Sequence, residues 1–144
     1  TFAEIINHRI PADAGEDSVS LWPLLSGKRK TDTPLHEAII SQSVTGNFAV
    51  RMEKWKLLFS CGSGGWSTPN EATARKMSLP TTQLYDLDTD PKESKNVHTR
   101  HPKVVEQLTA VFRKFVENGR STPGPKQVNH HGTHWETIPW AKGK

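Results

Sequence analysis

The strongest constraint on the fold is the segment from Pro102 to Asn118, whose apolar residues recur at helical spacing. Pro102 suits the first position of a helix, and Gly119 suits the position that follows its end. The opposite face is polar and charged, so the apolar face must pack against a partner. The apolar positions are Val104, Val105, Leu108, Val111, Phe112, Phe115 and Val116. The sequence therefore predicts an amphipathic helix, whose simplest partner is one face of a sheet.

Four short runs rich in β-branched and aromatic residues can supply that sheet. We expect strands near residues 37–43, 47–53, 55–60 and 83–87. Glu53 and Lys54 alone separate the second run from the third, which fits a two-residue hairpin, although this pair is not typical of such turns. Strand alternation places Trp55 on the core side. The predicted fold class is α+β: a small four-stranded antiparallel sheet packed against one long C-terminal helix, with an extended C-terminal tail.

The remaining segments show weaker patterns. Residues 2–6 indicate the end of a helix, and residues 18–27 indicate a short helix capped by Ser18 or Ser20. Residues 61–80 have no sustained period and are expected to form a long loop. We predict three parts: a connecting segment at 1–35, a folded subdomain at 36–119 and an extended tail at 120–144.

Composition narrows the classes of function. The 144 residues carry a formal net charge of +4 at pH 7, which allows an anionic partner. The cations are mixed with acidic residues outside the run from Lys28 to Lys30, so we do not predict nucleic-acid binding. No apolar run is long enough to cross a membrane. Cys61 is the only cysteine, which excludes an internal disulfide.

Three histidines form the sharpest metal-like cluster in the sequence. His130, His131 and His134 lie within five residues, but no helical pattern aligns them and no second cysteine completes a common zinc set. His-rich tracts are compositional hints, so we expect a solvated tail and no metal site.

Acidic residues at 86–93 suggest a calcium loop at first sight. Asp86, Asp88, Asp90 and Glu93 are closely spaced, but the glycine and the downstream glutamate of an EF-hand are missing. We expect a turn in which the Asp side chains accept hydrogen bonds from backbone amides.

The glycine-rich stretch at 61–69 is the candidate binding segment. Gly64 and Gly65 allow the backbone to approach a ligand closely, and Trp66 offers a large aromatic surface. Two interpretations of Trp66 stay open: burial in the core, or contact with a substrate at the rim of a cleft.

Five segments, in order, resemble the C-terminal part of sulfatases of the arylsulfatase class. The most specific is QLYDLDTDPKESKN at residues 83–96, which resembles the LYDL-x-x-DP-x-E-x-x-N segment of that family. The others lie at residues 17–27, 48–57, 62–67 and 119–124. One Asp-Pro turn would mean little, whereas five ordered segments are specific.

The resemblance implies a large α/β catalytic domain followed by a subdomain of four antiparallel strands and one long helix. It implies that the whole polypeptide hydrolyses sulfate esters, using a formylglycine nucleophile and a divalent cation such as calcium, both in the catalytic domain. By the same resemblance we expect that domain to precede Thr1 and to be the partner of this chain, with residues 1–35 as the connecting segment. The resemblance also implies an enzyme in the periplasm or outside the cell.

The family's nucleophile motif, Cys or Ser followed by x-Pro-x-Arg, is absent from this sequence. Ser67 and Ser121 are each followed by the proline without the arginine, and Cys61 by neither. We therefore predict no catalytic residue in this chain, which should be inactive alone. Its expected role is structural support, with residues 64–66 forming part of the substrate-cleft rim. The alternative is a stand-alone binding module for an anionic glycan.

Overall fold

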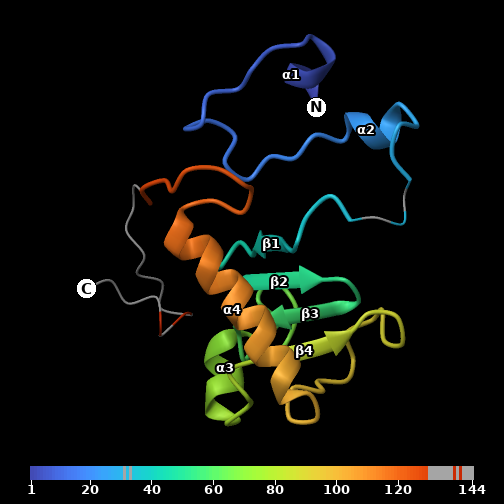
Figure 1. Ribbon diagram of the computed structural model, residues 1–144. Coiled ribbons are helices and arrows are strands. Elements are labelled where there is room, and N and C mark those ends of the chain that lie inside the picture. The colour runs from blue at the N-terminus through green and yellow to red at the C-terminus, as the bar shows by residue number, and fades with distance from the viewer. Residues whose placement is uncertain (31, 33, 130–137, 139, 141–144) are drawn as a thin grey trace.

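A four-stranded antiparallel sheet crossed by one long helix forms the centre of the molecule (Figure 1). The computed structural model describes residues 1–30, 32, 34–129, 138 and 140. The strands lie side by side in chain order: β1 (Ile39–Gln42), β2 (Phe48–Met52), β3 (Trp55–Leu58) and β4 (Gln83–Asp86). The described helices are α1 (Phe2–Ile5), α2 (Trp22–Leu25), α3 (Glu71–Lys76) and α4 (Pro102–Asn118). This is the α+β architecture that the sequence predicted.

The hairpin between β2 and β3 has the two-residue turn expected from the sequence. Met52 pairs with Trp55, so Glu53 and Lys54 alone reverse the chain. Glu53 adopts a φ of 53°, in the left-handed region that such a tight turn requires. Trp55 is half-buried and packs against the core, as strand alternation predicted.

One face of the sheet is covered by α4. Val50, Leu57 and Leu84 lie opposite one another on three neighbouring strands and are fully buried. The phenyl ring of Phe112 on α4 lies above them, with its centroid 5.3 Å from those of both Phe48 and Phe59. The helix residues buried in this contact are Leu108, Phe112 and Phe115. The periodic residues of the sequence therefore mark the true core.

Pro102 and Gly119 set the ends of α4, as predicted. Pro102 occupies the first turn, and Gly119 ends the helix in the left-handed conformation with a φ of 62°. The backbone N–H of Arg120 then donates to the carbonyl oxygen of Phe115. The chain thus reverses towards the N-terminal segment.

Residues 1–30 lie away from the sheet and expose much apolar surface (Figure 1). Polar contacts with the turn after α4 hold this segment: the N–H of Ser121 donates to Asp17 Oδ1 at 2.8 Å, and Gln127 Nε2 donates to the carbonyl of Ala12 at 3.1 Å. The exposed large apolar side chains here are Phe2, Ile5, Ile6, Ile10, Leu21 and Leu25. The segment is therefore joined to the subdomain mainly through its polar groups.

The short helices differ from expectation in extent. The predicted helix at 18–27 forms only from Trp22 to Leu25, and Leu21 rather than a serine occupies its N-cap. Ser20 Oγ still accepts a hydrogen bond from the N–H of Trp22. Because Pro23 suits only a first turn, the helix cannot extend further towards Ser18.

The prediction of an unbroken loop at 61–80 was wrong, because α3 lies within it. The helix has six residues, and Ala74 is its one buried position, so no apolar period was visible in the sequence. Asn70 caps it by accepting a hydrogen bond from the N–H of Thr73 at 2.9 Å. The signal available in the sequence was Asn70, a residue type that often caps helices, followed by the acidic Glu71 in the first turn.

Two described residues of the tail return to the core. Ile138 is fully buried, and the Trp140 ring lies 5.6 Å from that of Phe112. The candidate metal ligands His130, His131 and His134 lie outside the described residues. The proposed boundaries at 35 and 119 remain predictions. In the part of the chain that the structure describes, no helix is both long and apolar enough to cross a membrane.

Truncation of the α4 contact tests this architecture. Leu108→Ala should lower the free energy of unfolding by about 2 to 5 kcal/mol, because a fully buried side chain leaves a cavity. Gln107→Ala, on the exposed face of the same helix, should change it by less than about 0.5 kcal/mol. Urea unfolding of both variants measures the difference. Equal, small losses would mean that α4 does not pack on the sheet.

Candidate functional site

The acidic segment after β4 is a hydrogen-bonded turn, as predicted. Asp86 Oδ1 accepts from the N–H of Asp88 at 3.2 Å, and Asp90 Oδ2 accepts from the N–H of Lys95 at 2.8 Å. A hydrogen bond from Lys54, 2.8 Å away, lowers the pKa of the Asp86 carboxyl. These carboxylates are occupied by backbone and lysine donors. Among the described residues, no three His, Cys, Asp or Glu side chains gather as metal ligands would.

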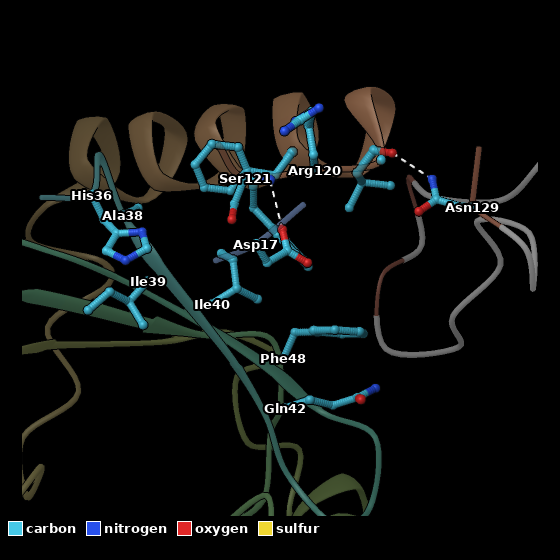
Figure 2. Close-up of a pocket in the computed structure, with 14 residues that line it drawn as sticks. Asp17, His36, Ala38, Ile39, Ile40, Gln42, Phe48, Arg120, Ser121 and Asn129 are labelled. Carbon is cyan, nitrogen blue, oxygen red and sulfur yellow. Dashed lines mark hydrogen bonds between the residues drawn. The ribbon is translucent and has the colours of Figure 1, made fainter. Parts of the chain in front are cut away.

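A pocket of about 320 Å³ lies between β1 and the C-terminal half of α4 (Figure 2). Its polar groups hold the backbone together: Asp17 binds the N–H of Ser121, and Asn129 donates to the carbonyl of Val116 at 2.8 Å. Arg120 donates to the carbonyls of Ala12, Thr122 and Pro125. The sequence did not indicate this pocket. Its charged groups, Asp17 and Arg120, already have hydrogen-bond partners. We therefore assign the pocket a structural role, where the N-terminal segment contacts the turn after α4.

The glycine-rich loop (residues 61–69) presents the candidate residues Gly64, Gly65 and Trp66 together at the surface. Gly64 adopts a φ of 70°, which favours glycine. The Trp66 side chain is 92% exposed and therefore takes no part in the described core. Ser63 fixes the shape of the loop, because its N–H donates to the carbonyl of Pro69 at 2.8 Å.

A hollow of about 180 Å³ lies beside this loop. Ser63 and Gly64 of the loop line it, together with residues of the sheet such as Leu58 and with Asn47. The hydroxyl of Thr45, between β1 and β2, donates to the carbonyl of Gly64 at 3.0 Å and so joins the loop to that turn. The loop thus borders a concave surface that both polar and apolar side chains line.

Glu71, at the start of α3, binds the beginning of the loop. Its Oε2 accepts from Ser60 Oγ at 2.8 Å and from the N–H of Gly62 at 3.0 Å. Its Oε1 accepts from Cys61 Sγ at 3.1 Å and lies 3.5 Å from an Arg75 guanidinium nitrogen. One carboxylate therefore binds three successive residues of the chain.

Gln83 and Tyr85 hold the same residues from the sheet. Gln83 Nε2 donates to the carbonyls of Ser60 and Gly62, both at 2.8 Å. The hydroxyl of the buried Tyr85 donates to Gln83 Oε1 at 2.6 Å, which fixes the orientation of the amide. Tyr85 is therefore buried and uses its hydroxyl as a polar end. The network links β4 to the loop.

Protonation in this cluster follows from the hydrogen bonds. Burial opposes ionisation of Glu71, but hydrogen bonds from Cys61, Ser60 and the backbone outweigh it, so its pKa lies below the usual value. Burial, and then the bond to Glu71, raise the pKa of the Cys61 thiol. Cys61 is therefore a neutral donor and Glu71 an ionised acceptor near neutral pH.

Glu71 was missed as a site residue by the sequence analysis. The available signal was Asn70 followed by Glu71 and, four residues later, Arg75, which marks the first turn of a helix. That signal predicts α3, but it does not predict that the carboxylate turns back to residues 60–62.

Comparisons with known proteins agree with this fold. Residues 36–143 match a family model described as the C-terminal region of aryl-sulfatase. The chain is 32% identical, over 119 residues, to an N-acetylgalactosamine-6-O-sulfatase of Bacteroides thetaiotaomicron, covering 78% of this chain and 21% of that protein. A solved structure concerned with the metabolism of multiple glycosaminoglycans by Bacteroides thetaiotaomicron matches with a TM-score of 0.59 and 28% identity, over 78% of this chain and 22% of that one.

The chain belongs to the aryl-sulfatase C-terminal family. The resemblance in the sequence is thereby confirmed. The chain spans about a fifth of the length of the relatives that it matches.

Two glycines test the close contact between the loop and α3. A Cβ at Gly62 would lie 2.7 Å from the backbone nitrogen of Glu71, whereas one at Gly65 would meet nothing within 4 Å. Gly62→Ala should therefore cost about 1 to 3 kcal/mol of stability, as overpacking does. Gly65→Ala is the matched control and should change stability by less than about 0.5 kcal/mol. Thermal or urea unfolding that ranks the two variants equally would contradict the described contact.

The lowered pKa of Glu71 predicts a pH-dependent contribution to stability. Because the folded state favours the ionised carboxylate, its contribution is complete above the unfolded value of about 4.3 and is lost as the pH falls through the folded pKa. The stability difference between the wild type and Glu71→Gln should be largest near neutral pH and shrink in acid. Urea unfolding from pH 7 to pH 3 measures it, with Glu106→Gln on the exposed face of α4 as control. A difference that grows in acid would contradict the assignment.

Proposed function

We propose that this chain is the C-terminal part of a sulfatase and that the catalytic domain precedes it in the polypeptide. The family match over residues 36–143 carries this proposal. The exposed apolar surface of residues 1–30 supports it, since six large apolar side chains there need a partner. The preceding domain is the partner that we assign to them.

Sulfate-ester cleavage requires an activated oxygen nucleophile and, in this class, a divalent cation that neutralises charge on the sulfuryl oxygens. The chain contains no Cys or Ser in the nucleophile motif. The described residues do not fit a cation site either, because no set of three suitable ligands comes together. We therefore assign the formylglycine and the cation, calcium or a similar ion, to the preceding domain.

We assign to this chain structural support and part of the rim of the substrate cleft. The glycine-rich loop supports the second role, because Trp66 is exposed on a loop whose backbone is fixed by hydrogen bonds. An indole on a loop whose backbone is fixed in this way can stack on a sugar ring at a small cost in conformational freedom of the loop. The neighbouring hollow offers polar groups to the same ligand.

A sulfated sugar is the substrate class that we propose. The matched relative is named as an N-acetylgalactosamine-6-O-sulfatase, and the matched structure concerns glycosaminoglycans. A sugar sulfate combines a ring face for Trp66 with an anionic group for the catalytic domain. The first substrate to test is therefore a 6-O-sulfated N-acetylgalactosamine.

Because the nucleophile and the cation are assigned to the preceding domain, we predict that the 144-residue chain alone releases no sulfate. Purified chain should leave both an aryl sulfate and the sulfated amino sugar intact, and the polypeptide that includes the preceding domain should hydrolyse at least one. Ion chromatography of free sulfate measures both. Sulfate release by the pure chain would refute the proposal. A mature polypeptide of only this mass would favour the alternative, a stand-alone glycan-binding module.

Trp66→Ala tests the rim role. In the whole polypeptide it should raise KM, or lower kcat/KM, for the natural substrate by roughly two- to twelvefold, the usual effect of losing one aromatic stacking contact. The midpoint of thermal unfolding should stay nearly unchanged, because the side chain is exposed. Trp55→Ala is the contrasting control and should lower the midpoint, since Trp55 packs on the core. Earlier unfolding of Trp66→Ala with unaltered kinetics would reject the rim role.

A further inference from the structure

We propose that Glu71 is a positioning residue for the glycine-rich loop and, through the loop, for Trp66. The inference rests on the proposed rim role of Trp66 for its functional consequence. Its structural part, that Glu71 fixes the loop, stands on the contacts of the described residues and can be tested without substrate.

The contacts of Glu71 point to the loop and not to the core. Apart from Arg75 on its own helix, the donors that it binds belong to Ser60, Cys61 and Gly62. These residues follow the end of β3 at Leu58 and lead into the loop that carries Trp66. The carboxylate accepts side-chain and backbone donors together, so it fixes both the position and the direction of the backbone there. Charge-assisted hydrogen bonds of this kind are stronger than neutral ones.

The helix that carries the Glu71 carboxylate, α3, is itself capped and packed. Asn70 caps α3, and Ala74, one turn after Asn70, is completely buried. The close approach of Gly62 to the backbone of Glu71 leaves no room for a side chain between them. The start of α3 and the start of the loop are thus in direct backbone contact. Functional groups held by short, packed elements keep a narrower range of positions than groups on free loops.

The loop has few other means of holding its shape. Trp66 is exposed, and the segment from Ser63 to Trp66 contributes no buried apolar side chain. Its other hydrogen bonds among the described residues include those from Thr45 to Gly64, from Ser63 to Pro69 and Ser67, and from Gln83 to Gly62, and bonds between Ser63 and Gly65 within the loop. Loss of Glu71 should therefore release the loop without unfolding the sheet, because α4 covers the opposite side of β2 and β3.

The functional consequence is a loss of apparent affinity. If the loop keeps its binding geometry only about a tenth of the time, the apparent affinity for a ligand that needs it falls roughly tenfold. Catalytic groups in another domain are untouched. KM should rise while kcat stays nearly constant, which is the pattern of lost preorganisation rather than of lost chemistry.

The test compares Glu71→Ala, Glu71→Gln and Asp86→Asn in the whole polypeptide. Asp86 is the matched control: its carboxylate is also partly buried, also has a lowered pKa, and lies at the opposite end of β4 from the loop. Asp86→Asn should reduce stability without releasing the loop. Glu71→Gln keeps one carbonyl acceptor at the original length, so its effects should lie between those of the wild type and of Glu71→Ala.

Hydrogen exchange measured by mass spectrometry on peptides covering 61–69 gives the structural readout. We expect exchange to be at least roughly tenfold faster in Glu71→Ala, as for an opened local structure, and unchanged in Asp86→Asn. Steady-state kinetics give the functional readout, with KM raised roughly tenfold in Glu71→Ala. In a Trp66→Ala background the Glu71 substitution should add little, because both act through the same side chain.

The outcomes separate this inference from the rim proposal. Unchanged exchange in residues 61–69 of Glu71→Ala overturns the inference whatever the kinetics. Faster exchange with an unaltered KM, in an enzyme whose KM does respond to Trp66→Ala, also overturns it. Faster exchange in an enzyme that is indifferent to Trp66→Ala supports the positioning of the loop by Glu71 and rejects the rim role instead.

Discussion

The packing of Phe112 and its neighbours on α4 against one face of the sheet is the contact on which the rest of the structure depends. The strands have only four or five residues each, and the apolar face of so small a sheet must be buried against another element. The helix buries the row formed by Val50, Leu57 and Leu84 and joins the rings of Phe48 and Phe59. The glycine-rich loop follows β3, and Gln83, which binds its backbone, is the first residue of β4.

The candidate site is held by a different kind of interaction. No apolar side chain of residues 63–66 enters the described core, and a polar network from Glu71, Gln83 and Tyr85 supports the loop instead. Such networks specify one arrangement when every member has its partner, and they fail together when one is removed. This explains how a loop with three glycines keeps a defined backbone shape while the aromatic side chain on it is exposed.

The sequence predicted the elements whose burial is periodic. The seven apolar residues of α4 and the alternation in β2 and β3 locate the helix and the hairpin closely, because each has one buried face. It did not predict α3, since a six-residue helix with one buried alanine has no measurable period. The sequence also could not predict the Glu71 network, because residues 60–62, 71 and 83 come together only when β3, α3 and β4 are in place. The sequence did identify Gly64, Gly65 and Trp66, which share one exposed loop, although their function remains a proposal.

The most direct test is a crystal structure of the whole polypeptide with a sulfated sugar bound at the catalytic domain. The proposal predicts that the Trp66 indole lies in van der Waals contact with the sugar, with carbon atoms about 4 Å apart, and that the carboxylate of Glu71 still binds residues 60–62. A complex in which the glycine-rich loop points into solvent, away from an occupied cleft, would contradict the rim role directly.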